Sequence, residues 1–179
     1  PLSRYQQFVA RRIADTVHCA INNLEPARIA WGSVPQPKHV FNRRWFVNDE
    51  SARRNPFGGV DRVRMNPPQA AAADGQPAGP TDPEFSFISI QAQSGRPLSL
   101  FSAYSLHYVG GVPAADISAD YFGVFNQRMR ELLGAERQEP AFVSLLANGT
   151  SGNINNIDFR AKRTPRKPYE HMHAVAHEI

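Results

Sequence analysis

Apolar residues recur at helical spacing in three parts of the chain. From Ser3 to about Leu24 they follow one another at steps of three and four residues, with polar residues between them. Ser3, just before this pattern, is a residue type that caps helix N-termini. A second helix is expected from a cap at Ser118 to Gly134, because glycine accepts the left-handed backbone that ends a helix. Its pattern predicts that Leu132 or Leu133 is buried near its end. A third begins near Tyr169.

Four apolar stretches bounded by turn residues predict strands, over residues 27–34, 84–92, 98–109 and 140–147. The turn "QSGRP" predicts a hairpin between the second and third. The helix between the third and fourth suits a crossover that joins parallel strands of one sheet. The pattern therefore predicts an α/β fold, with a mixed β-sheet flanked by helices.

Residues 35–83 form a long irregular segment rich in Pro, Gly, Ala and Arg, and we expect Gln69–Gln76 to be disordered. The chain opens at Pro1 without a methionine, just before a helix, and stops at Ile179 within another. We interpret residues 1–179 as one incomplete domain, shortened at both ends.

Charge and composition exclude some classes of protein. The net charge is +4, and much of the basic excess lies in Arg160–Pro168. We interpret this segment as a solvated connector rather than a nucleic-acid site, because no aromatic residue stands among the charges to stack on bases. No apolar run approaches the ~20 residues of a membrane-spanning helix. Cys19 is the single cysteine, which excludes an internal disulfide, and we expect a buried thiol.

The residues that carry chemistry gather after the third and fourth predicted strands. His107 closes one strand, and a loop rich in small polar residues, Asn148–Asn156, follows the other. Parallel strands end at the same edge of a sheet, where ligands bind in open α/β folds. His107 is either a core histidine with one hydrogen bond or a metal ligand or general base. The loop is either a wall of a binding site or a turn that satisfies its own backbone.

Two further groups have both a structural and a functional interpretation. Ser118 and Asp120 cap the helix that follows His107, or they orient its imidazole from behind the site. His173 and His177 share a helix face, but Glu178 follows them instead of lying between them as in a zinc-protease helix. We interpret that face as exposed rather than metal-binding.

Several segments, in this order and spacing, resemble the neutral/alkaline non-lysosomal ceramidase family, especially its shorter bacterial relatives. They are "PARIAWG", "FNRRW", "FSAYSLHYVGG", "ISADYFGVF" and "NGTSGNINNIDF". The strand ending in His107 is similar to the family's strand ending in V-H-G-T, and "ISADYFG" to its I-S-G-D-N-K-G. The resemblance covers about Leu2 to Phe159. It implies a fragment of the family's N-terminal catalytic domain.

The resemblance implies a zinc-dependent amidohydrolase that cleaves an N-acyl amide such as ceramide in the full-length protein. In the family, two histidines, a glutamate and a tyrosine hold zinc, and His107 matches the second histidine. The other three ligands belong to segments outside this chain. Because catalytic zinc takes about three protein ligands, we expect the chain alone to bind zinc poorly or not at all.

The family's catalytic serine lies in a segment G-D-V-S-P-N, and aligning the glycines places Asn155 on that serine. Asparagine is no nucleophile, but it can donate a hydrogen bond to an oxyanion. The resemblance also implies substrate contacts from the loop, at Asn148, Gly149, Gly152 and Asn153, with Asp120 and Ser118 behind the site. The alternative is a non-catalytic, ceramidase-like binding or structural protein that lost the serine.

The expected partner is a lipid or another N-acyl amide, with no nucleic acid and no transmembrane segment. The sequence itself assigns neither a compartment nor an oligomeric state. The resemblance points to a secreted or periplasmic protein.

Overall fold

The computed structural model describes residues 1–179 and contains four α-helices, two short 3-10 helices and nine strands. In chain order they are α1 Arg4–Asn22, β1 Ala27–Pro35, η1 Pro37–His39, β2 Phe41–Asn42, β3 Arg44–Phe46, η2 Ser51–Arg53, β4 Arg64–Met65, α2 Gln69–Ala73, β5 Gln76–Pro77, β6 Glu84–Ala92, β7 Pro97–Tyr104, α3 Asp120–Leu132, β8 Val143–Asn148, β9 Ile154–Asn155 and α4 Glu170–Glu178. No helix combines the length and the apolar character needed to cross a membrane.

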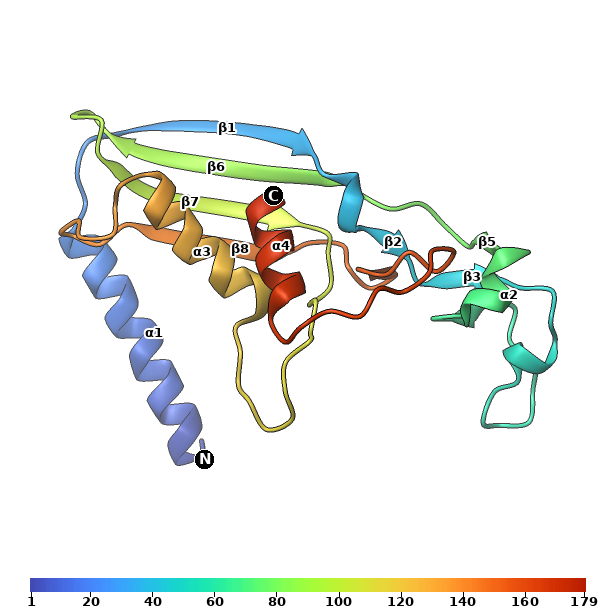
Figure 1. Ribbon diagram of the computed structural model, residues 1–179. Helices are drawn as coiled ribbons and strands as arrows, with labels where there is room; N and C mark the ends of the chain where they lie inside the picture. Colours follow the sequence, from blue (N-terminus) through green and yellow to red (C-terminus); the bar gives the residue numbers. More distant parts are fainter.

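The main sheet has the strand order β1-β6-β7-β8 (Figure 1). β6 pairs antiparallel with both β1 and β7, whereas β7 and β8 run parallel and are joined by α3. The predicted mixed α/β sheet, its hairpin and its crossover are therefore confirmed. Two small sheets, β2-β9 and β4-β3-β5, organise most of the long irregular segment.

Helices α3 and α4 cover one face of the main sheet (Figure 1). The aromatic rings of Phe85 on β6 and Phe125 on α3 lie 5.5 Å apart at the centre of this core. Tyr121 is fully buried, and its hydroxyl donates to the carbonyl of Leu106 at 2.9 Å. Burial of this apolar layer is the main driving force for the fold. The core also contains Leu100, Tyr104, Phe142, Leu146, Met172 and Val175.

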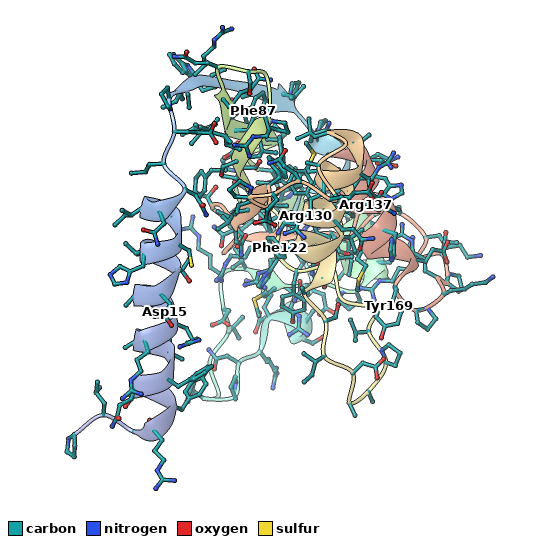
Figure 2. The ribbon with its side chains drawn as sticks, turned by 90° about the vertical axis from the view of Figure 1, so that its left-hand side faces the viewer. Asp15, Phe87, Phe122, Arg130, Arg137 and Tyr169 are labelled. Carbon is teal, nitrogen blue, oxygen red and sulfur yellow. The ribbon has the colours of Figure 1, made fainter.

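The opposite face of the sheet is apolar and uncovered. Trp31, Ile88, Phe101 and Leu145 pair in register across all four strands, and all are exposed, Trp31 by 81%. Figure 2 shows α1 set apart on the side of the sheet away from α3. None of its residues is buried, although its N-terminus is closed by the predicted Ser3 cap, paired reciprocally with Gln6.

Three predictions about burial and order are wrong. Cys19 is exposed, because the helix that carries it packs on nothing in the chain. Leu132 and Leu133 are exposed at the end of α3, where the helix passes beyond the sheet-facing core. Residues 69–76 are not disordered: α2 forms there, and Ala72 is completely buried beside Trp45 and Val47.

Two boundaries also differ from the prediction. β7 ends at Tyr104, so His107 lies three residues beyond the strand instead of closing it. The N-cap of α3 is Ala119 without a side-chain hydrogen bond to the helix, and Ser118 Oγ instead accepts from the amide of Asp120 at 3.0 Å. The predicted stop at Gly134 is confirmed, with a backbone φ of 62°.

Candidate functional site

The parallel pairing of β7 and β8 brings two loops to one edge of the sheet, as predicted. Tyr104 pairs with Asn148 at the strand ends, and the amide of Gly149 donates to the Tyr104 carbonyl at 2.9 Å. The loops stay in contact just beyond the sheet. A Cβ atom on Gly149 would lie 2.7 Å from Ser105 Oγ and 3.3 Å from Ser105 Cα, so only glycine fits this approach.

A hydroxyl network ties these two loops to a third segment. Ser105 Oγ donates to Asp82 Oδ2 at 3.0 Å and lies 2.9 Å from Thr150 Oγ1. The amide of Thr150 also donates to Ser105 Oγ, at 3.1 Å. Asp82 belongs to the connection before β6, so the network fixes three chain segments at the sheet edge.

His107 is half-buried, and its Nδ1 atom is buried without a hydrogen-bond partner. Its ring packs edge-on against Tyr108, with ring centroids 4.8 Å apart. A buried polar atom without a partner is costly, and in native proteins it is explained by strain, a catalytic role, or a bound water or ion; Arg53 Nε and Ser102 Oγ are two further such atoms. Both interpretations of His107, as a core histidine with one hydrogen bond and as a metal ligand or general base, therefore stay open.

Asp120 holds the backbone that follows His107, and its carboxylate does not contact the imidazole. Oδ1 accepts from the amides of Val109 at 2.9 Å and Tyr121 at 2.6 Å, and Oδ2 accepts from Gly110 at 2.7 Å. Asp120 itself has a φ of 54°, an uncommon backbone conformation for a residue with a side chain. This carboxylate positions the loop rather than the ring.

The amides of the Asn148–Asn156 loop bind other parts of the chain. Asn153 Oδ1 accepts from Arg44 Nε at 2.7 Å, and Asn155 Nδ2 donates to Asn66 Oδ1 at 3.0 Å. Asn156 Nδ2 donates to the Val109 carbonyl at 3.2 Å. An amide nitrogen carries two hydrogens, so Asn155 keeps one N–H without this partner. The abundance of asparagine in the loop is explained in large part by these internal contacts.

Two cavities flank the loop. One of about 280 Å³ is bordered by Asp82, Thr150 and Asn153. The other, of about 580 Å³, is bordered by Asn156, the Val109–Pro113 loop and residues 161–168. Neither His107 nor Asn155 lines either of these two cavities.

Lys38, His39 and His171 line the larger cavity, and the first two bind Glu178 beside it, in a cluster that sequence patterns did not indicate. Glu178 Oε1 lies 2.5 Å from Lys38 Nζ, and its Oε2 lies 2.7 Å from His39 Nε2. The His39 ring faces that of His171, with centroids 6.1 Å apart. Burial lowers the pKa of His39, and the hydrogen bond from Lys38 lowers the pKa of Glu178. His39 and Glu178 are 139 residues apart in the sequence, so no local motif reveals their contact.

No protein-family profile matches the sequence, and no characterised protein matches it significantly. Among solved structures, the chain is similar to neutral ceramidase from Pseudomonas aeruginosa, with a TM-score of 0.62 and 20% sequence identity. The match covers 98% of this chain and 25% of that chain, so the chain spans about a quarter of the ceramidase it resembles. This similarity confirms at the level of the fold the resemblance seen in the sequence motifs.

A second structure, of a ceramidase complexed with C2, has a TM-score of 0.48 at 21% identity, and the match covers 76% of this chain and 18% of that chain.

Among the described residues, no group of three or more His, Cys, Asp or Glu side chains is arranged to hold a metal ion. His107 is thus an isolated candidate ligand within this chain.

The close approach at Gly149 can be tested by substitution. Gly149→Ala should lower the free energy of unfolding by about 1–3 kcal/mol, because its Cβ meets Ser105 and the sheet edge must move. Gly152→Ala is the matched control in the same loop, since no atom lies within 4 Å of its added Cβ. Urea denaturation should separate the two variants. Equal stability would show that the loops are not in tight contact.

The acid side of the stability profile should depend on His171. Burial, followed by the charge of Arg166, lowers the pKa of His171 from 6.5 to about 4. Between these values the unfolded chain takes up a proton that the folded chain does not. The free energy of unfolding should therefore be fully retained above pH 6.5 and should fall as the pH drops towards 4.

Urea denaturation across this range should show that the free energy of unfolding depends less steeply on pH in His171→Gln than in the wild type. The difference in slope should correspond to the uptake of less than one proton on unfolding. His173→Gln, an exposed position on the same helix, is the control and should keep the wild-type slope. A His171→Gln profile that matches the wild-type profile would contradict the burial of this ring.

Proposed function

We propose that the chain forms part of the catalytic domain of a metal-dependent amide hydrolase of the ceramidase kind, acting on a lipid or other N-acyl amide. The observation that carries the proposal is the buried, unpartnered Nδ1 of His107 at the sheet edge where the two loops meet. The similarity in fold to neutral ceramidase supports it.

His107 is the residue that would bind zinc. An imidazole nitrogen is a preferred zinc donor, and this one has no competing hydrogen bond. The chain offers no second and third ligand around it, so the complete set requires residues from the rest of the protein. When bound, zinc polarises a carbonyl group and lowers the pKa of coordinated water to about 7.

The remaining residues would position the substrate. The second N–H of Asn155 would donate to the oxygen of the amide carbonyl, while its other N–H stays on Asn66. Backbone groups of Asn148, Gly149, Gly152 and Asn153 would contact the substrate. Asp120 would hold the backbone beyond His107 in a fixed conformation, with Ser118 supporting the Asp120 amide.

The second candidate is a ceramidase-like protein that binds an amide without cleaving it. Asn155 stands where the family's serine is expected, and its amide already takes part in a hydrogen bond within the protein. Asn153 and Asn156 are likewise engaged. A loop so committed to internal contacts suits a structural or binding role as well as a catalytic one.

Metal content provides a test that does not depend on activity. The full-length protein should contain about one zinc per chain, and His107→Ala should reduce occupancy at least tenfold, because one of about three protein ligands is lost. Atomic absorption on dialysed protein gives the stoichiometry. His18→Ala, on the exposed surface of α1, is the control and should keep the wild-type zinc content.

Hydrolysis of a short-chain N-acyl sphingosine separates the two candidate functions. The hydrolase proposal expects turnover in the wild type and at least a hundredfold loss in His107→Ala. Zinc binding and substrate binding without turnover would support the non-catalytic candidate. Equal zinc content in wild type and His107→Ala would remove His107 from the metal site.

A further inference from the structure

The basic segment at residues 160–168 is not only a solvated connector. Its side chains Lys162, Arg163, Arg166 and Lys167 line one side of the 580 Å³ cavity. None of the four forms an ion pair with an acidic residue of the chain. Four unneutralised cations around one small cavity give it a strongly positive potential.

The acidic groups nearby offset only part of this charge. Asp158 is the only acidic residue that lines the cavity, and its Oδ1 accepts from the amide of Arg160 at 2.9 Å. Glu178 is held by Lys38 and His39. With Lys38 offset by Glu178, the four basic side chains less Asp158 leave an excess of about three positive charges for a ligand.

The cavity is also lined by apolar residues. They come from β2, from the loop after β7 and from the segment after β9: Phe41, Val109, Val112, Pro113 and Ile157. A cavity of this size accommodates a small molecule, and an apolar wall with a few charged groups is typical of such sites. It is too small for a nucleic-acid duplex.

We propose that this cavity binds an amphiphilic organic phosphate, with the phosphate group among the basic side chains and the apolar portion against the apolar lining residues. Guanidinium groups suit phosphate because their N–H groups match two of its oxygens at once. His171 also lines the cavity and would offer an additional N–H. None of the residues assigned to the hydrolase site lines this cavity, so the proposal does not depend on the hydrolase function.

Calorimetric titration with four probes tests the proposal on the wild-type protein. Hexyl phosphate should bind most tightly. Inorganic phosphate should bind more weakly because it lacks the apolar portion, and hexanoate because it lacks the second negative charge. Hexanol should show no binding. Raising the salt from 50 to 200 mM should weaken the binding of hexyl phosphate, since the site is open to screening ions.

The variant Arg163→Gln/Arg166→Gln should lower the affinity for hexyl phosphate about tenfold or more, because charge-assisted contacts to phosphate are lost. Arg137→Gln, an exposed arginine away from the cavity, should leave it unchanged. Val112→Asp should lower the affinity as well, by placing a carboxylate among the apolar lining residues. Unchanged affinity in the double variant, or equal binding of hexanol and hexyl phosphate, would overturn the proposal.

Discussion

The structure depends on the parallel pairing of β7 with β8, which α3 makes possible. Because the two strands run in the same direction, their loops leave the sheet at one edge, and Tyr104 stands opposite Asn148 at the point of departure. The start of α3 reinforces this arrangement. Asp120, its first residue, binds the amides of Val109 and Gly110 and so connects the crossover helix to the loop that follows His107.

This constraint gives the two loops different properties. The loop after β8 is bound to other segments through Arg44, Asn66 and Val109, which lie far from it in the sequence. His107, by contrast, carries a buried nitrogen that nothing in the chain satisfies. Contacts within the chain therefore hold the loop in place, whereas the Nδ1 atom of His107 has no such contact.

Local patterns were enough to predict the four strands of the main sheet and the helices α1, α3 and α4, but not the short elements within residues 35–83 or the surroundings of each element. The hairpin, the crossover and the cap at Ser3 depend on neighbouring residues, and each was recognised from the sequence. The exposure of Cys19 was not, because an amphipathic pattern does not reveal whether the chain supplies a partner for the helix. The cluster of His39 with Glu178 was also missed, because spacing along the sequence carries no signal for contacts between residues so far apart.

The most direct test of this account is amide hydrogen exchange at Val109 and Gly110. If the Asp120 carboxylate holds the loop at the sheet edge, both amides should be protected in the wild type although they lie outside any strand. Asp120→Ala should abolish their protection and leave that of β7 and β8 in place. Exchange of the two amides at the rate of an unstructured peptide in the wild type would contradict the account.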